Sequence, residues 1–287
     1  VSAVQRAQPA TVRVRTNQGS GSGFIISESG YIVTNHHVVE GARQFVVDYA
    51  RGEQVPATLV GSAPEFDLAV LKVDGPVPAA IVWGDSSALP LGGTVIAIGS
   101  ALGDYQNSVT VGILSGVNRE LGSLIGLLQT DAAINHGNSG GPLLNRAGEV
   151  IGINTMVVRG SSSDAEGLGF AIPSNIARAI TQQLIDSGQA QRPLMGISLL
   201  ALNSQVAQER GLSVTEGAYI QEVTANSAAA RAGLQAGDVI IAIAGRPVTD
   251  REPLQMHVLS HVPGEQLSLT ILRNGQSMEM QLTLGAA

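Results

Sequence analysis

Short apolar runs separated by turn-forming residues dominate the first part of the chain. Thr11-Val12-Arg13-Val14-Arg15 alternates apolar and polar side chains with a period of two residues, which indicates a strand with one buried face. Further apolar runs bounded by Gly, Ser, Pro or Asp lie at Phe24-Ile25-Ile26, Phe45-Val46-Val47 and Leu68 to Val73. Strands of this length with regular turn signals between them predict a β-barrel.

A second set of apolar runs follows residues 76 to 91, a segment rich in Pro and Gly. The members of this set are Thr94 to Gly99, Ser108 to Ser115, Pro142 to Asn145, Glu149 to Val158 and Leu168 to Ile172. The expected strands therefore fall into two groups, and this part of the chain is predicted to be all-β.

A helical pattern follows the second group of strands. Ser174 fits the N-cap position, and Gly188 is expected to end the helix. Four apolar residues share one face of this helix: Ile176, Ile180, Leu184 and Ile185. The helix is therefore predicted to pack one side against a core, and to act as the hinge before a second domain.

The chain length of 287 residues fits two domains, with the boundary expected near Gln191-Arg192-Pro193. This boundary gives a domain of residues 1–190 and a smaller domain of residues 191–287. No low-complexity linker separates the two, so we expect them to stay within reach of each other. In the smaller domain, Thr249 and Glu252 form a capping-box pattern before a helix that carries Leu254 and Val258 on one side.

Composition excludes several classes of protein. The net charge is −7 and Lys72 is the only lysine, which argues against a nucleic-acid surface. There is no cysteine, so disulfides, thiol catalysis and cysteine-zinc sites are excluded. No apolar run approaches the roughly 18 residues of a membrane span, and the chain starts at Val1 without a signal or anchor, as a processed or truncated product would.

Candidate chemistry is concentrated in Gly137-Asn138-Ser139-Gly140-Gly141-Pro142-Leu143. Glycines on both sides relieve the Cβ constraint, so the serine can sit on a tight turn with neighbouring N–H groups directed to one place. Attack by a serine hydroxyl on an amide carbonyl creates an oxyanion, which backbone donors such as those of Gly137 and Ser139 stabilise. A Gly/Ser-rich turn between strands is the structural alternative.

A serine nucleophile needs a base, and two adjacent histidines are candidates. His36 and His37 end the apolar run that begins at Tyr31. The residues alone leave open which of them is the base, because adjacent strand residues point to opposite faces. A metal site at this pair has little support, since the sequence has no His-Glu-x-x-His pattern and no carboxylate cluster near the pair.

The base in turn needs a carboxylate to orient it. Asp67 directly precedes the apolar run from Leu68 to Val73, and Asp131 and Asp85 compete with it for this role. With Asp67, the chain order is His, Asp, Ser, which is the chymotrypsin order and differs from those of subtilisin and the α/β-hydrolases.

Glycines alternate with serines in Gly19-Ser20-Gly21-Ser22-Gly23, a pattern that a phosphate loop can also have. This stretch precedes an expected strand, whereas a dinucleotide fingerprint would open a helix. No organic cofactor is therefore expected.

Several motifs together resemble the HtrA (Deg) serine proteases over essentially the whole chain. The motifs are Thr34-Asn35-His36-His37-Val38, Asp67-Leu68-Ala69-Val70, Gly137-Asn138-Ser139-Gly140-Gly141-Pro142-Leu143, Gly152-Ile153-Asn154-Thr155 and Gly167-Leu168-Gly169-Phe170-Ala171-Ile172-Pro173. The resemblance implies two six-stranded chymotrypsin-like β-barrels with the active site in the cleft between them. In these enzymes neither a metal nor an organic cofactor is required.

The resemblance also implies roles for single residues. His37 is the base, Asp67 orients it and Ser139 is the nucleophile, with an oxyanion hole formed by residues 137 to 139, that is Gly137, Asn138 and Ser139. His36 becomes a surface or supporting residue. Asp131 falls in a Gln-Thr-Asp stretch that family members also carry.

The last third of the chain resembles a PDZ domain, a small α+β fold. The matching segments are Gly217-Ala218-Tyr219-Ile220, residues 228 to 240, Pro263-Gly264-Glu265 and Leu272-Arg273-Asn274-Gly275. PDZ domains capture C-terminal peptides by strand addition, with the peptide carboxylate on successive backbone N–H groups. The resemblance places the carboxylate loop at Leu194, Met195, Gly196 and Ile197, and the helix side of the pocket at Leu254 and Val258.

The substrate pocket is expected between Ala133-Ile134 and the strand Gly152-Ile153-Asn154-Thr155, whose backbone would pair with substrate. Ala133 lies six residues before Ser139, where trypsin keeps its charge. Without an acidic residue there, basic P1 side chains gain nothing. Small aliphatic P1 residues such as Val, Ala or Leu are therefore predicted.

Three further residues bear on regulation. The digestive proteases carry an aspartate before the nucleophile, and Asn138 at that position cannot form the salt bridge that switches those enzymes. His136 replaces a proline of many relatives and also occurs in a DegS-like regulatory branch of the family. We expect Arg119, in a loop after Ser115-Gly116-Val117-Asn118, to sense PDZ ligands and to help order Gly137.

The resemblance implies an endopeptidase that acts on unfolded or exposed protein segments, in quality control or in envelope stress response. Relatives are periplasmic or extracytoplasmic, some of them membrane-anchored, and assemble as trimers through N-terminal segments, here Val1 to Ala10. The alternative function is a non-catalytic PDZ scaffold or holdase with an inert protease-like domain. The sequence leaves open the choice between a housekeeping protease and a regulated protease of one target.

Overall fold

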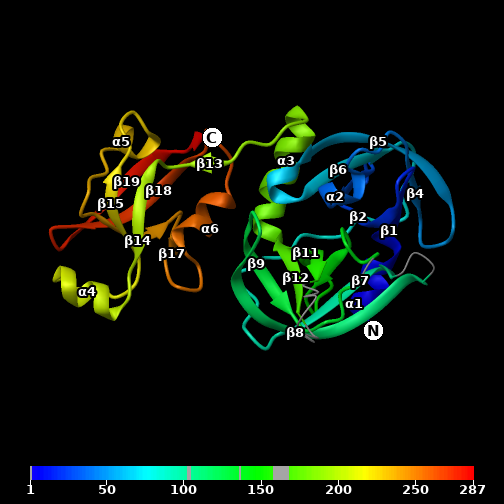
Figure 1. Ribbon diagram of the computed structural model, residues 1–287, viewed down its shortest axis with the longest axis horizontal. Helices are drawn as coiled ribbons and strands as arrows, with labels where there is room; N and C mark the ends of the chain where they lie inside the picture. Colours follow the sequence, from blue (N-terminus) through cyan, green and yellow to red (C-terminus); the bar gives the residue numbers. More distant parts are fainter. Residues whose placement is uncertain (1, 102–104, 136, 158–167) are drawn as a thin grey trace. The chain divides into compact units, whose positions relative to one another are not determined.

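The computed structural model describes residues 2–101, 105–135, 137–157 and 168–287. The chain divides into two compact units, Val1–Ala190 and Gln191–Ala287, and each is described here by itself. Figure 1 shows that strands dominate both units. Within the described ranges no helix is long and apolar enough to cross a membrane.

The first barrel of the first unit contains six antiparallel strands that close on themselves in the order β1-β2-β3-β6-β5-β4. Its strands are β1 (Thr11–Thr16), β2 (Ser20–Ile25), β3 (Tyr31–Thr34), β4 (Phe45–Asp48), β5 (Gln54–Ala63) and β6 (Leu68–Val73). Alternate side chains of these strands point into the barrel. Phe24, Ile32, Leu68 and Leu71 of these strands are fully buried.

A second closed barrel follows, in the order β10-β11-β12-β9-β8-β7. Its strands are β7 (Thr94–Ala101), β8 (Tyr105–Leu121), β9 (Leu124–Thr130), β10 (Pro142–Leu144), β11 (Val150–Val157) and β12 (Gly169–Pro173). Its core includes Val95, Leu114, Leu143 and Ile151. The expected pair of six-stranded barrels is thereby confirmed.

Helical segments connect and flank the barrels. They are α1 (Ser2–Ala7), the 3-10 turns η1 (Gln8–Ala10) and η2 (Pro64–Phe66), α2 (His36–Val39) and α3 (Ser174–Ser187). The two histidines therefore lie on a helical turn after β3, where an extended strand end was expected. At the N-terminus, the Arg6 guanidinium donates to the carbonyl of Ala147 at 2.5 Å, and a Cβ on Gly148 would lie 3.1 Å from the carbonyl oxygen of Ala3.

The helix α3 packs against strands of both barrels, so it belongs to the first unit and is not a separate hinge. Gly188 ends it in the left-handed conformation with φ 74°, as predicted. The predicted N-cap is wrong, because Pro173 holds that position and Ser174 is the first helical residue. The hydroxyl of Ser174 donates instead to the carbonyl of Gly84 at 2.8 Å.

The second unit is built around one antiparallel sheet in the order β14-β15-β16-β18-β19, with β17 paired to β16. Its strands are β13 (Pro193–Leu194), β14 (Ile197–Ala201), β15 (Ala218–Val223), β16 (Val239–Ile243), β17 (Arg246–Pro247), β18 (Gln266–Arg273), β19 (Gln276–Thr283) and β20 (Gly285–Ala286). Its helices are α4 (Ser204–Arg210), α5 (Ala228–Ala232) and α6 (Leu254–Leu259). Ile220, Ile240, Leu269 and Ile271 form the centre of its core.

The capping-box pattern before α6 is only half realised. The Thr249 hydroxyl accepts the backbone N–H of Glu252 at 3.0 Å, as in a capping box. The helix, however, starts at Leu254 with Pro253 as N-cap. The Glu252 carboxylate lies 3.0 Å from the Arg246 guanidinium and does not return to the Thr249 amide.

Candidate active site and peptide groove

Asp67 and His37 form the first contact of the candidate site. Asp67 follows η2 in the left-handed conformation, φ 51°, and directly precedes β6. Both of its carboxylate oxygens lie 2.9 Å from Nδ1 of His37, and one accepts the His37 backbone N–H at 3.0 Å. This arrangement holds the proton of the neutral ring on Nδ1 and leaves Nε2 as an acceptor. The His37 side chain is 41% exposed, whereas that of Asp67 is 12% exposed.

Asn35 fixes the backbone that carries this pair. It is completely buried and its Nδ2 donates to the main-chain carbonyl of Asp67 at 2.9 Å. The bond ties the start of α2 to the residue before β6. The geometry of the pair therefore depends on buried backbone as well as on the two side chains.

Thr155 of β11 joins the carboxylate to the serine. Its hydroxyl donates to Oδ2 of Asp67 at 2.5 Å, and its main-chain carbonyl accepts the Ser139 hydroxyl at 2.8 Å. Thr155 is 2% exposed, and its bond to Asp67 is buried, whereas its bond to Ser139 is partly buried. The structure thus brings His37, Asp67 and Ser139 together around one threonine, although the sequence suggested only a substrate contact for it.

Hydrogen bonds to three successive main-chain carbonyls fix the turn that carries Ser139. The carbonyls of Gly137, Asn138 and Ser139 accept hydrogen bonds from the Ser22 hydroxyl at 2.6 Å, the Gly141 amide at 2.9 Å and the Ser22 amide at 2.8 Å, respectively. Gly137 has φ 99°, a value that favours glycine. His136 lies outside the described residues.

The glycine-rich strand β2 is a part of the site that the sequence analysis missed. A Cβ on Gly21 would lie 3.1 Å from the carbonyl oxygen of Ser139, and Ser22 supplies two hydrogen bonds to the serine turn. Glycines inside a strand mark places where another backbone approaches closely. That signal was present in Gly19-Ser20-Gly21-Ser22-Gly23, and it points to the serine turn instead of a phosphate.

The competing candidates for base and orienting residue make other contacts. Nε2 of His36 lies 3.9 Å from the Glu40 carboxylate, one turn along α2. Asp131 accepts the backbone N–H of Ile113 at 2.7 Å. Asp85 accepts from the Ser87 backbone at 2.9 Å and from Asn175 at 2.8 Å. Of these three aspartates, Asp67 is the one that contacts His37.

Ala133 and Ile134 were predicted to line the substrate pocket. Ala133 is exposed, and its carbonyl accepts from Thr110 at 3.0 Å and from Nδ2 of Asn138 at 3.3 Å. Ile134 is buried, and its side chain fills the space that a Cβ on Gly169 would need. These contacts place both residues directly before the serine turn.

The expectation for Ile153 and Asn154 needs correction. Both are completely buried. Ile153 pairs with Ile172 of β12, while the Asn154 backbone exchanges hydrogen bonds with Gly140 and Gly141. Their backbone is therefore used within the second barrel to support the serine turn and does not present an edge to a substrate.

Arg119 lies within β8 and not in a loop, as had been expected. Its Nε donates to the side-chain oxygen of Gln129 on β9 at 2.9 Å. The neighbouring Asn118 has φ 54°, and the pairing register of β8 with β9 shifts here. In the described ranges no group of three or more His, Asp or Glu side chains could hold a metal ion.

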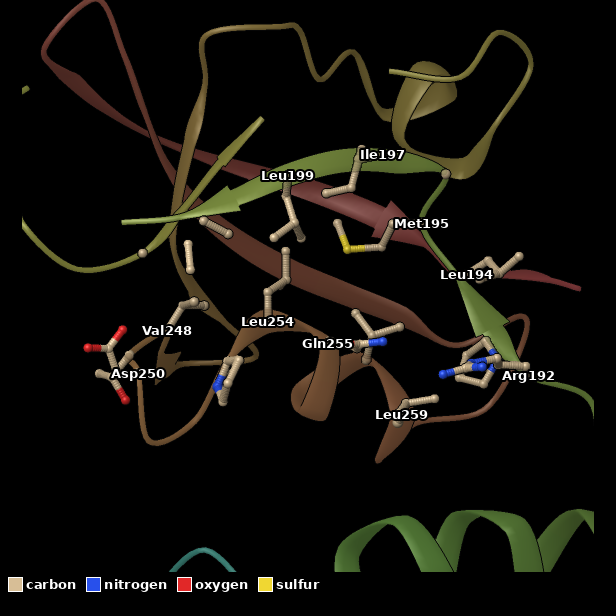
Figure 2. Close-up of a pocket in the computed structure, with 18 residues that line it drawn as sticks. Arg192, Leu194, Met195, Ile197, Leu199, Val248, Asp250, Leu254, Gln255 and Leu259 are labelled. Carbon is tan, nitrogen blue, oxygen red and sulfur yellow. The ribbon is translucent and has the colours of Figure 1, made fainter. Parts of the chain in front are cut away.

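A groove of about 540 Å³ lies between β14 and α6 of the second unit (Figure 2). The six residues predicted for peptide binding all line it: Leu194, Met195, Gly196, Ile197, Leu254 and Val258. Gly196 has φ 79°, and a Cβ there would lie 2.3 Å from that of Ser227, so glycine is required at this position. β14 is the edge strand of the sheet, with β15 as its one partner in the sheet.

Family comparisons match both units. The trypsin-like peptidase domain family matches residues 21–153, and the PDZ domain family matches residues 193–284. A protein of Bacillus subtilis (strain 168) named serine protease Do-like HtrA is 44% identical over 94% of this chain and 64% of its own length. The periplasmic pH-dependent serine endoprotease DegQ of Escherichia coli (strain K12) is 40% identical over 93% of this chain and 59% of its own length. The chain thus spans about three fifths of the length of these curated relatives.

Solved structures of serine proteases match almost the whole chain. The HtrA-type protease AlgW with a tripeptide has a TM-score of 0.73 and 39% identity, covering 99% of this chain and 96% of that one. A serine endoprotease from Yersinia pestis has a TM-score of 0.62 and 35% identity, covering 99% and 97%. Two closed barrels and a PDZ unit agree with these matches, and the chain belongs to the HtrA family of trypsin-like serine proteases with a PDZ domain.

Proposed function

We propose that this chain is a serine endopeptidase that cleaves unfolded or exposed protein segments. The observation that carries the proposal is the set of bonds joining His37, Asp67, Thr155 and Ser139. In this proposal residues 1–190 form the protease domain and residues 191–287 the PDZ domain, in agreement with the two compact units.

Catalysis starts with a rotation of Ser139. Its hydroxyl proton now points to the Thr155 carbonyl, so the side chain must turn toward Nε2 of His37 before the proton can move. His37 takes the proton as the Ser139 oxygen bonds to the substrate carbonyl carbon. Asp67 accepts from Nδ1 and stabilises the imidazolium that forms.

Negative charge then develops on the substrate carbonyl oxygen. The amides of Gly137 and Ser139 donate to it, within the hole assigned to Gly137, Asn138 and Ser139. As the tetrahedral intermediate collapses, the C–N bond breaks and His37 returns its proton to the leaving amine. Water then attacks the acyl ester on Ser139, with His37 again as base, which releases the acid and restores the serine.

The specificity proposal keeps Ala133 and Ile134 as pocket residues. Ala133 carries no charge and Ile134 narrows the space beside Gly169, so small aliphatic P1 side chains are favoured. Thr155 stays part of the proposed site through its carbonyl, which accepts from Ser139, and its hydroxyl, which donates to Asp67. Mass-spectrometric mapping of casein fragments tests this preference, and a dominant Lys or Arg at P1 contradicts it.

In the second unit, we propose that the groove binds C-terminal peptides, with Leu194, Met195, Gly196 and Ile197 at the carboxylate and Leu254 and Val258 facing the last side chain. The AlgW structures with bound tripeptide or decapeptide support peptide binding by a relative. The free edge of β14 suits strand addition. Substrate delivery or activation by such peptides is then the role of this unit.

Arg119 keeps its proposed regulatory role as a residue that couples peptide binding to order at Gly137. Its anchor at Gln129 gives it a defined starting position on β8. Peptide-stimulated turnover of casein should fall in Arg119→Ala while basal turnover persists. Unchanged stimulation rejects the role, and Arg178→Ala on an exposed face of α3 serves as the matched control.

Location and assembly complete the proposal. The names of the Pseudomonas putida and Escherichia coli relatives include the word periplasmic, and we propose an extracytoplasmic location for this chain, with the membrane-anchored form as the alternative that cell fractionation distinguishes. We also propose a homotrimer or a multiple of trimers, to be tested by light scattering. Ala3, Ala7 and Ala10 are buried within the chain itself, so the exposed side chains of α1 are the ones left for partner contacts.

One experiment tests the enzymatic proposal directly. A fluorophosphonate probe should label the wild-type chain at one serine, and Ser139→Ala should abolish both labelling and casein cleavage. His37→Ala should slow labelling strongly. If the wild type neither labels nor cleaves casein, with or without a C-terminal peptide, the non-catalytic scaffold or holdase is the correct function.

A further inference from the structure

The peptide groove has a charge at each end and an uncharged middle. Of its lining residues, Arg192 and Asp250 are the charged ones. Figure 2 shows Arg192 beside Leu259 at one end, and Asp250 beside Val248 at the other. The middle is formed by apolar or neutral side chains, among them Leu199, Leu254 and Gln255. A ligand that fills the whole groove therefore meets opposite charges at its two ends.

The direction of a bound peptide follows from the position of the Gly196 loop. This loop directly precedes β14, so a peptide that pairs antiparallel with β14 has its carboxylate at Ile197 and its upstream residues toward Ala201. Antiparallel strands pair residue by residue, and Ala201 lies four residues after Ile197. The peptide residue opposite Ala201 is therefore four positions before the C-terminal one. This inference rests on the proposed capture of C-terminal peptides.

Backbone pairing connects the Ala201 end of β14 to Asp250. Ala201 pairs with Ala218 of β15, and Ala218 pairs with Ile240 of β16. The amide of Val248 donates to the carbonyl of Ile241, next to that pair, at 2.9 Å. Asp250 follows Val248 by two residues and lines the groove with Ala201 and Ala218. Asp250 therefore lies at the upstream end of the peptide path.

Side-chain alternation decides which peptide residue meets Asp250. Successive strand residues point to opposite faces, so the C-terminal residue and the second and fourth residues before it share one face. The last side chain enters the apolar pocket on the α6 side, formed in part by Leu254 and Val258. The fourth residue before the C-terminus therefore also points to the α6 side, where Asp250 lies just ahead of the helix.

From these observations we propose that the groove selects C-terminal peptides with an apolar last residue and a Lys or Arg four positions before it, paired with Asp250. The free carboxylate lies at the Arg192 end and the basic side chain at the Asp250 end. Asp250 is exposed, so the pair is solvated and its contribution is modest. It acts on the choice of ligand, because an acidic side chain at the same position is repelled.

The test uses the full chain carrying Ser139→Ala, so that peptides are not cleaved. Two fluorescein-labelled decapeptides ending in valine differ only in Lys or Glu at the fourth position before the C-terminus, and a C-terminally amidated Lys peptide is the third ligand. Fluorescence anisotropy should give about 5-fold tighter binding of the Lys peptide at low salt, narrowing at high salt. Asp250→Asn should reduce the preference below about 2-fold, and Asp250→Arg should reverse it.

Glu209→Gln removes the same charge from α4, outside the groove, and should keep the full preference. Equal binding of the Lys and Glu peptides by a chain that rejects the amidated peptide overturns the selectivity for a basic residue and leaves C-terminal capture intact. Equal loss of preference in Glu209→Gln and Asp250→Asn also overturns it, because net charge would then be the cause. If none of the free-acid peptides binds, peptide capture itself is wrong, while fluorophosphonate labelling of the wild type still reports on the protease separately.

Discussion

The hydroxyl of Ser139 donates its hydrogen bond to the main-chain carbonyl of Thr155, at 2.8 Å. The side-chain hydroxyl of the same threonine donates to Asp67, the carboxylate that holds His37. A hydroxyl has one proton, so Ser139 in this arrangement does not donate to His37. Thr155 therefore orients the carboxylate and at the same time holds the serine in the position from which it must rotate.

The first prediction concerns the Thr155 hydroxyl. Thr155→Val keeps the shape and the main-chain carbonyl but leaves Asp67 without one buried donor. Hydrogen bonds to charged groups are worth about 1.5–3 kcal/mol, so kcat/KM for a peptide substrate should fall about 10- to 100-fold. Thr155→Ser restores the donor and should recover most of the activity. Full activity of Thr155→Val, with an unchanged melting temperature, contradicts this role.

Ser22 carries the second prediction. Its hydroxyl donates to the Gly137 carbonyl at 2.6 Å. Ser22→Ala frees this carbonyl and removes one of the two bonds from Ser22 that hold the serine turn, so the Gly137 and Ser139 amides are less well positioned for the oxyanion. We expect kcat to fall about 10-fold or more with little change in KM, as loss of a transition-state contact predicts. Ser20→Ala, exposed on the same strand, is the control and should behave as wild type.

The third prediction compares alanine substitutions at Gly140 and Gly122, which distinguish the cost of backbone strain from the cost of a steric clash. Both have positive φ, 85° and 61°. A Cβ on Gly140 would lie 2.1 Å from the carbonyl oxygen of Ser22, whereas nothing lies within 4 Å of a Cβ on Gly122. Gly122→Ala should cost about 1–2 kcal/mol of unfolding free energy from strain alone. Gly140→Ala adds a further loss of about 1–3 kcal/mol and should abolish turnover, because the serine turn must move.

Urea unfolding of the two variants, with casein cleavage as the activity readout, checks this difference. Equal destabilisation of both variants contradicts the steric argument. Retained cleavage by Gly140→Ala contradicts the proposed dependence of the serine turn on strand β2.

Local patterns in the sequence were enough for several strands of the first unit and for the catalytic candidates. The period-two run at Thr11 to Arg15 became β1, and the apolar run from Leu68 to Val73 became β6 with the same bounds. Side-chain alternation and glycine in a turn act over a few residues, so the chain itself carries this information. The same reasoning located Ser139 on its turn.

Contacts between distant residues could not be predicted in this way. Ser174 looked like an N-cap, but its hydroxyl found the Gly84 carbonyl, 90 residues away in sequence. Asn154 was expected to face substrate, yet it lies buried beneath the serine turn. Strands β5 and β9 were not predicted, since Pro56 and Gly61 interrupt one and Gly126 the other. In each case tertiary packing decided between local alternatives of similar energy.

The last prediction concerns the pH dependence of the second unit. His257 lies on the face of α6 away from the groove, is 5% exposed, and its Nε2 lies 3.1 Å from the carbonyl of Pro247, so the neutral ring donates there. Burial lowers the pKa of His257 below its usual value of 6.5, against the opposing effects of the Pro247 carbonyl and the Glu252 carboxylate. Arg246 and His261 add smaller effects in the lowering direction.

Because the pKa of His257 is lowered in the folded state, the direction in which stability changes with pH is fixed. Below about pH 6.5 the unfolded chain binds a proton that folded His257 does not, so the stabilisation is fully present above this pH and is lost as the pH falls below it. The loss approaches about 1.4 kcal/mol per pH unit at most. Hydrogen exchange of β16 and β18 between pH 5 and 7.5, corrected for intrinsic rates, measures the opening free energy. His257→Gln should remove the slope and His261→Gln should retain it, and a slope that persists in His257→Gln contradicts the assignment to His257.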